Sequence, residues 1–278
     1  MRSRAALVAL GLLLLAGLGS GWSPPPAPGP QQRDVTWEVV ALPCPAGTGP
    51  ADGICLAYNG TIPGPTLDIN LLDSVSLTLV NHVGQTVWSL PGPQDVKARL
   101  ANASVSFHVH GMSLEASEDG MSHAMAPGFL DSFAPPGGSF TYHFRAPYNG
   151  TWHYHDHVLG PDGNEGLARG LEGALAVRAG GDLRPDAILD VHTTDRGAPF
   201  VSPTTTVPRG GTLEIVLAGL GDGTWTLRVT NLDGYDQTLQ TAPGLSEHLL
   251  APNAQGVYRW RLENDITGSE YEGTVSAP

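Results

Sequence analysis

The stretch GSFTYHFRAPYNGTWHYHDHV, residues 138–158, decides the fold class of this chain. It holds two runs rich in aromatic and β-branched residues, separated by a proline and a glycine, which is the pattern of two short β-strands joined by a turn. Regular repetition of such runs predicts an all-β protein built as a sandwich or barrel. No strong amphipathic helix is evident, and only residues 162–172 are compatible with a short one. The other strand-like runs are 34–43, 67–82, 103–111, 173–179, 187–194, 204–220, 222–232, 236–242, 246–250, 255–264 and 272–277.

The strand-like runs form two series. The segment LDINLLDSVSLTLVNH at 67–82 is echoed by TTVPRGGTLEIVLAGL at 205–220, which suggests two copies of one β-sandwich. A chain of 278 residues is long enough to bury a core in each copy. We therefore predict a first domain over residues 34–179 and a second over residues 180–278.

Two histidine motifs, HVH at 108–110 and HDH at 155–157, carry the chemistry. Side chains alternate across a strand, so the two imidazoles of each motif should lie on one side. Four imidazoles converging from two strands predict a metal site, and imidazole without a nearby thiolate suits copper and zinc first. A histidine in a strand is otherwise a half-buried polar residue, but two such pairs, each beside an aromatic residue and a glycine, favour the metal. His153 shares the face of His155, as a neighbouring imidazole or a core residue.

Cys44 and Cys55 are the only cysteines, and they bracket the turn-rich loop PAGTGPADGI. In an exported protein such a close pair is most simply a disulfide that closes a short loop. No histidine lies beside either cysteine in the sequence, so a copper–thiolate site is not supported.

Residues 1–21 have a basic start, an apolar run and a small-residue end, which is the pattern of a signal peptide. We expect an exported protein, periplasmic or extracellular, with no membrane contact unless the signal peptide stays uncleaved. Residues 22–33 are rich in proline and predict an extended linker. The net charge of −13 argues against nucleic acid and anionic membrane surfaces as partners, because both bind basic faces.

The quoted motifs resemble the multicopper oxidase family, and most closely the bacterial two-domain (small) laccases. The resemblance covers roughly residues 60–190 and runs through IPGPTLDINLLDSVSLTLVNH, SFHVHGMSLEASEDG, APPGGSFTYHFRAPYNGTWHYHDHVLG, GLARGLEGALAVR and GDLRPDA. It implies a cupredoxin-like Greek-key sandwich in each domain, copper as the cofactor, and a homotrimer whose copper cluster forms between subunits.

The resemblance also divides the four histidines between two kinds of copper. His108 would face the type 2 copper, whereas His110, His155 and His157 would serve the type 3 pair. Asp119 matches an acidic residue that assists proton delivery to bound oxygen, although a turn residue before a glycine would look the same.

The second domain departs from the family. Members carry there the remaining cluster ligands and the cysteine and histidines of the type 1 copper, yet the matching stretches 224–236 and 255–273 contain neither histidine nor cysteine. His192 and His248 are the only histidines beyond Arg178, isolated in sequence and expected to be surface or core residues. The sequence therefore predicts an exported copper-binding protein without ordinary laccase activity.

Three alternatives stay open at this point. The chain could be an oxidoreductase of multicopper oxidase type, laccase-like and O₂-reducing, completed by a partner chain or using a reduced copper site. It could be an interaction module whose histidines are relics. Thioether and imidazole groups at Met112, Met121, His123 and Met125 suit Cu(I) and would favour copper transfer, or they simply pack in a loop.

Overall fold

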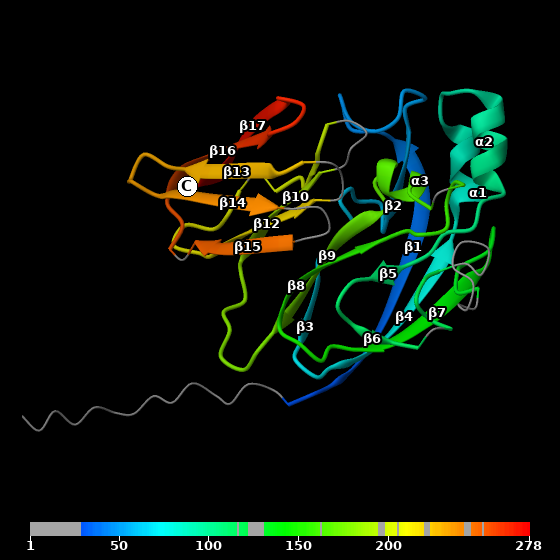
Figure 1. Ribbon diagram of the computed structural model, residues 1–278, viewed down its shortest axis with the longest axis horizontal. Coiled ribbons are helices and arrows are strands. Elements are labelled where there is room, and N and C mark those ends of the chain that lie inside the picture. The colour runs from blue at the N-terminus through cyan, green and yellow to red at the C-terminus, as the bar shows by residue number, and fades with distance from the viewer. Residues whose placement is uncertain are drawn as a thin grey trace, which may run out of the picture.

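The protein folds into two β-sandwiches that lie side by side, as Figure 1 shows for this computed structural model. The predicted all-β class is confirmed. The predicted signal peptide lies outside the described residues. These are 29–115, 117–121, 131–161, 163–193, 198–204, 206–219, 223–241, 246–251 and 253–278.

The first sandwich has two sheets, ordered β2-β1-β4-β7-β6 and β3-β9-β8-β5. Two pairings, β1 with β4 and β3 with β9, are parallel, whereas the other pairs are antiparallel. The strands are β1 (Gln32–Pro43), β2 (Ile54–Tyr58), β3 (Leu67–Asn70), β4 (Ser74–Asn81), β5 (His108–Val109), β6 (Ser113–Leu114), β7 (Ser139–Arg145), β8 (Gly150–His155) and β9 (Glu172–Arg178).

The second sandwich repeats this plan with sheets ordered β11-β10-β12-β15 and β14-β13-β16-β17. Its strand β12 pairs parallel with β10, as β4 does with β1, so the two echoed sequence segments occupy equivalent positions. The boundary between residues 179 and 180 stays a prediction. The strands are β10 (Ala187–Thr193), β11 (Phe200–Val201), β12 (Leu213–Gly219), β13 (Trp225–Thr230), β14 (Asp236–Thr241), β15 (Ser246–Ala251), β16 (Gly256–Asn264) and β17 (Glu270–Ala277).

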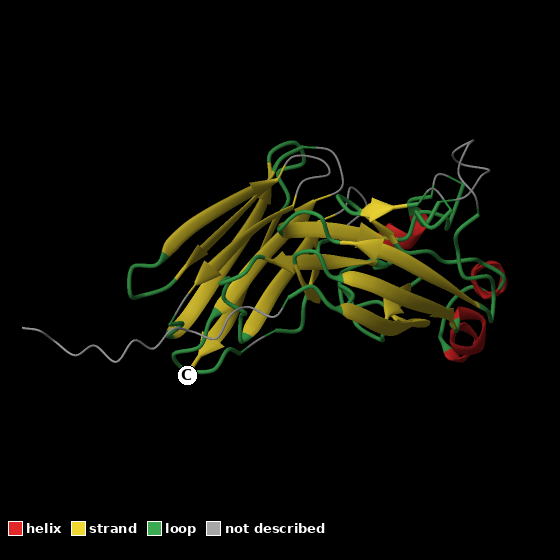
Figure 2. Cartoon of the chain, turned by 90° about the horizontal axis from the view of Figure 1, so that it is seen from below, coloured by secondary structure: helices red, strands yellow, loops and turns green. Residues whose placement is uncertain are grey.

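Helices are few and short. Helix α3 (Glu165–Ala168) lies within the segment predicted to hold one, but α1 (Val83–Thr86), the 3₁₀ turn η1 (Val87–Ser89) and α2 (Gln94–Ala101) were not predicted. Helix α2 buries only Lys97 and Leu100, so it shows little helical periodicity. Helices α1 and α2 lie at the end of the first sandwich that is remote from the second (Figures 1 and 2). No helix in the described ranges is long and apolar enough to cross a membrane.

The run 67–82, predicted as one strand, is divided between two sheets by a turn at Asp73. This buried carboxylate accepts hydrogen bonds from the Asn70 amide at 3.0 Å, the Gln31 amide at 2.7 Å and the Arg33 guanidinium at 3.1 Å. The same contacts bring the start of β1 into the sheet. The predicted linker over 22–33 is therefore too long, because strand pairing begins at Gln32.

An aromatic cluster fills the first sandwich between its sheets. The Tyr154 ring on β8 lies 5.2 Å from Trp37, 5.0 Å from Phe107 and 5.5 Å from Tyr58, measured between ring centroids. The Tyr58 hydroxyl donates to the Ser106 carbonyl at 2.6 Å. Because these rings are buried, they hold β8 firmly against the opposite sheet.

The other face of the β3-β9-β8-β5 sheet is covered by the second sandwich. Strand β15 contacts β8, and β10 contacts β9. Ala174 and Ala176 on this face of β9 are each only 1% exposed. Side chains on this face of β8 and β9 are therefore removed from water by a separate part of the chain.

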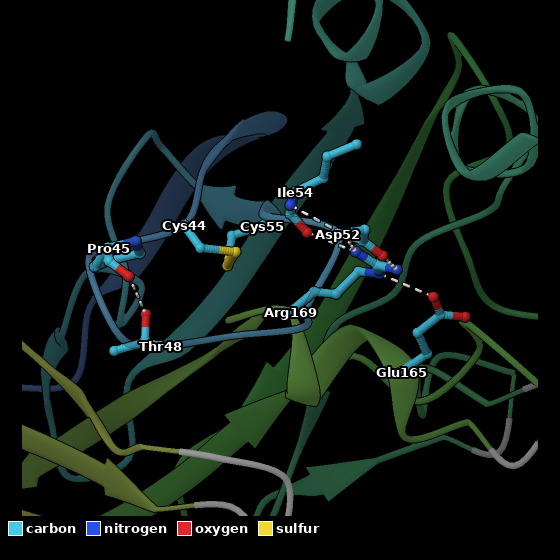
Figure 3. Close-up of a disulfide and its surroundings, with 8 residues drawn as sticks. All are labelled: Cys44, Pro45, Thr48, Asp52, Ile54, Cys55, Glu165 and Arg169. Carbon is cyan, nitrogen blue, oxygen red and sulfur yellow. Dashed lines mark hydrogen bonds and ion pairs between the residues drawn. A yellow bond between two sulfur atoms is a disulfide. The ribbon is translucent and has the colours of Figure 1, made fainter. Parts of the chain in front are cut away.

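The predicted disulfide between Cys44 and Cys55 is confirmed (Figure 3). It closes the loop before β2, which a second interaction also holds. The buried Arg169 guanidinium donates to the Asp52 carboxylate at 2.9 and 2.8 Å, to the Ile54 carbonyl at 2.6 Å and to Glu165 at 2.8 Å. This loop is thus anchored both covalently and by charge.

Reduction of the Cys44–Cys55 disulfide should lower the free energy of unfolding by about 2–3 kcal/mol, because the closed loop is short. Urea unfolding with and without dithiothreitol measures the change. A Cys44→Ala/Cys55→Ala variant is the control and should not respond to dithiothreitol. Equal stability of the oxidised and reduced wild-type protein would contradict this role.

Candidate metal centre

The two histidine motifs lie beside each other because β5 and β8 pair in antiparallel register. His108 is opposite His155, and Val109 is opposite Tyr154. The His110 amide donates to the His153 carbonyl at 2.9 Å and carries the pairing one residue further. Val109 and Tyr154 point into the core, so the histidines share the opposite face, as predicted.

The four imidazoles form one compact cluster. The Nε2 atoms of His110 and His155 face each other at 3.1 Å. His108 contributes a ring nitrogen within 4.8 Å of ring nitrogens of both. The His157 ring centroid lies 5.2 Å from those of His108 and His155. The structure thus brings together all four predicted ligands.

Backbone carbonyls hold two of the rings in a defined tautomer. His155 Nδ1 lies 2.8 Å from the Asp156 carbonyl oxygen, and His108 Nδ1 lies 2.6 Å from the Asp119 carbonyl oxygen. A carbonyl only accepts, so each Nδ1 carries the proton and donates it. The Nε2 atom of each ring therefore carries a lone pair, which in His155 faces His110 Nε2 at 3.1 Å, and this is how metal-binding histidines are oriented.

His157 is held by its backbone rather than by its ring. Its amide donates to the Ser106 hydroxyl at 2.9 Å. Its Nδ1 atom is buried and has no hydrogen-bond partner within the described parts of the chain. Buried polar atoms without a partner are uncommon in proteins, and many of them contact a bound ion or water molecule.

Asp156 ties the two motifs together from inside the protein. Its fully buried carboxylate accepts hydrogen bonds from the Ser106 amide at 2.6 Å and the Leu159 amide at 2.9 Å. Burial raises the pKa of this carboxyl to about 6, although the hydrogen bonds act in the opposite direction. The Asp156 side chain therefore holds the backbone between His155 and His157 in place but does not itself face the imidazoles.

The cluster favours uncharged imidazoles. Burial, assisted by the neighbouring imidazoles, lowers the pKa of His110 to about 4. Burial also lowers the pKa of His155 well below its usual range and the pKa of His157 to a smaller degree. Neutral imidazole is the form that binds metal ions, so the site is ready for a cation near pH 7.

Asp119 lies at the edge of the cluster. One of its carboxylate oxygens is 3.5 Å from His108 Nδ1, and its side chain is 22% exposed. Gly120 after it has φ +70°, and a Cβ there would collide with the Phe107 carbonyl oxygen. Asp119 thus lies beside the histidines and also in a tight turn, and its position fits both interpretations. A role in proton delivery stays a prediction.

The structure describes only part of the methionine-rich segment. Met112 packs against the first hydrophobic core, which favours the packing interpretation for this residue. His123 and Met125 lie outside the described residues.

A second group of polar side chains lies behind the first, and the sequence did not predict it. His192, expected to be a solitary surface or core residue, is completely buried and contacts Glu172 and Asp190. Glu172 also contacts His153. In the sequence the available signal was Glu172, a charged residue in a strand. Its partner His192 follows 20 residues later and lies in the other sandwich. His248 lies on β15 opposite Val216.

Comparison with known proteins identifies relatives of this chain. Residues 95–181 match the family model described as multicopper oxidase. The chain is 29% identical over 206 residues to the multicopper oxidase MmcO of Mycobacterium tuberculosis, which covers 69% of this chain and 36% of that protein. It is 28% identical over 240 residues to Laccase-1 of Botryotinia fuckeliana, covering 81% and 34% respectively. The matches thus span about a third of these relatives' length.

Solved structures show the same fold. A crystal structure described as a multicopper oxidase matches with a TM-score of 0.60 and 20% identity, covering 89% of each chain. The copper nitrite reductase of Nitrosomonas europaea matches with a TM-score of 0.55 and 17% identity, covering 89% of this chain and 94% of the other. The predicted fold of two cupredoxin-like sandwiches is therefore confirmed.

Replacement of Asp156 by alanine should destabilise the protein by about 2–4 kcal/mol, because two buried amides lose a charged acceptor. Chemical denaturation measures the loss. Glu118→Ala is the matched control, since that carboxylate pairs with the exposed His143 and should contribute less than about 1 kcal/mol. Equal stability of the two variants would show that Asp156 does not hold the motifs together.

Proposed function

Because the chain resembles multicopper oxidases, we propose that it is an exported copper-binding protein that uses His108, His110, His155 and His157 as ligands. The observation that carries the proposal is the convergence of four imidazoles, two of them with Nε2 lone pairs set by backbone carbonyls. Imidazole nitrogen suits copper, and both cysteines are bound in a disulfide, so the donor set is nitrogen alone. Bound copper would supply one-electron redox chemistry.

The protein's own residues prepare the site. The Asp119 and Asp156 carbonyls keep the rings of His108 and His155 oriented. The facing Nε2 atoms of His110 and His155, 3.1 Å apart, suit two ligands that share one ion. By resemblance, His108 would face a type 2 copper and the other three a type 3 pair. Coordination by neutral imidazoles weakens as the pH falls, because protons compete for the same lone pairs.

We further propose that this chain lacks ordinary laccase turnover. Strands β13, β14, β16 and β17 of the second sandwich contain no histidine and no cysteine. Laccase-like turnover needs a type 1 copper, at which electrons enter, and these residues provide no ligands for it. Export is supported by the pattern of residues 1–21 and by the disulfide, which belongs to an oxidising compartment.

The second candidate function is an O₂-reducing oxidoreductase that a partner chain completes, for example in a homotrimer. The open side of the cluster favours it. The side chains of His108 and Asp119 are 18% and 22% exposed, whereas His155 is 4% exposed. Ligands from a second chain would have access to the cluster on that side.

His110→Ala should lower copper affinity at least tenfold, because it removes one of the two facing ligands. Competition with a chromophoric Cu(I) chelator measures the affinity. His143→Ala is the matched control, since this imidazole lies in the same sandwich, is 60% exposed and pairs with Glu118 instead of with one of the four histidines. Unchanged affinity in a folded His110→Ala protein would refute the site assignment.

The copper-loaded chain should consume no oxygen above background when supplied with a phenolic electron donor. An oxygen electrode gives the rate, and size-exclusion chromatography with light scattering gives the oligomeric state of the same sample. Sustained turnover by a trimer would favour the second candidate function over the first.

A further inference from the structure

A second polar cluster lies between the two sandwiches, behind the four-imidazole site. It consists of His153 on β8, Glu172 on β9, and Asp190 and His192 on β10, and each is at most 4% exposed. We propose that His153, Glu172 and His192 form a second metal site, for a divalent ion such as Zn²⁺ or Cu²⁺. This site is separate from the proposed copper site and does not depend on it.

The spacing of the donor atoms fits a single ion. Glu172 Oε2 lies 3.3 Å from His153 Nε2 and 3.2 Å from His192 Nδ1, and donor atoms of all three residues lie within 4.8 Å of one another. A tetrahedral zinc ion with bonds of about 2.0–2.1 Å sets its ligand atoms roughly 3.3–3.4 Å apart. A charge-assisted hydrogen bond would instead be about 2.7–2.9 Å long. The observed distances are those of ligands rather than of tight ion pairs.

Asp190 orients the His192 ring toward this position. His192 Nε2 lies 2.6 Å from a carboxylate oxygen of Asp190, to which it donates a proton. The ring then presents Nδ1 to Glu172. A histidine held by a carboxylate through one nitrogen while the other binds an ion is the common arrangement in metalloproteins.

Two atoms of the cluster have no hydrogen-bond partner among the residues that the structure describes. Glu172 Oε1 and His153 Nδ1 are buried without a hydrogen bond to any described residue. Buried carboxylate oxygens are costly when unpaired. An ion held by both oxygens of Glu172 would satisfy the first of these atoms.

Charge balance also favours a cation here. Glu172 and Asp190 are both buried, and within the described parts of the chain their ion pairs are made only with histidines. A divalent ion would neutralise both carboxylates.

The site would join the two sandwiches, because His153 and Glu172 belong to the first and His192 to the second. An ion bound here should therefore stabilise their junction. The His153 ring centroid is 5.1 Å from that of His155, so the two clusters are adjacent but use different side chains.

The experiment is metal analysis of the full chain after chelator treatment, incubation with Zn²⁺ and desalting. The His192→Gln protein should retain about one Zn²⁺ per chain less than the wild type, and Zn²⁺ should raise the melting temperature less. His143→Gln is the matched control and should bind as the wild type does. Co²⁺ in place of Zn²⁺ should give visible absorption of a tetrahedral site in the wild type, and this should be lost in Glu172→Gln.

The two proposals fail separately in this design. His110→Ala should lose copper yet keep the Zn²⁺ that depends on His192, whereas His192→Gln should keep copper at the four-imidazole site. If His192→Gln does not fold, the near-isosteric variants Glu172→Gln and Asp190→Asn replace it, with Asp190→Asn expected to weaken Zn²⁺ binding by about tenfold. Equal Zn²⁺ content in folded wild-type and variant proteins would overturn the second site and leave a buried ion-pair network.

Discussion

The pairing of β8 with β5 on one side and β9 on the other is the constraint on which the rest of the structure depends. Through it His108 stands opposite His155, and His155 opposite Glu172. Tyr154 and Val109 consequently point into the aromatic core. A slip of one residue would send the histidines into that core and the aromatic rings outward. The packing of Tyr154 against Trp37 and Phe107 therefore holds the polar site in register.

The second sandwich changes the character of the polar face that this register creates. A sheet face open to water would let its histidines titrate normally, but contact of β15 and β10 with β8 and β9 removes water from much of it. Buried imidazoles then favour the neutral state unless a carboxylate is at hand. The pKa of His110 falls to about 4, whereas that of His192, between two carboxylates, rises to about 10. Burial and neighbouring charges thus give the two adjacent clusters opposite electrostatic character.

The junction between the sandwiches also contains an ion-pair network centred on Arg178. The Arg178 guanidinium at the end of β9 donates to the buried Glu214 carboxylate on β12 at 3.1 and 2.5 Å, and to Asp68 on β3 at 3.2 and 3.1 Å. Buried charges without partners are strongly destabilising, so this set favours one relative placement of the two sheets. The distances around Glu172 and His192 depend on the same placement.

Local patterns in the sequence determined the all-β class, the alternation in 150–158, the shared side of the histidine motifs and the Cys44–Cys55 pair, because each follows from a strand period or a short loop. Residues 54–58 and 94–101 were missed, since a fully buried short strand and a weakly amphipathic helix leave no clear period. The contact of His192 with Glu172 is invisible in the sequence, since Glu172 lies in another sandwich. Only the tertiary structure brought them together, because burial and charge pairing at the junction depend on how two separate folding units meet.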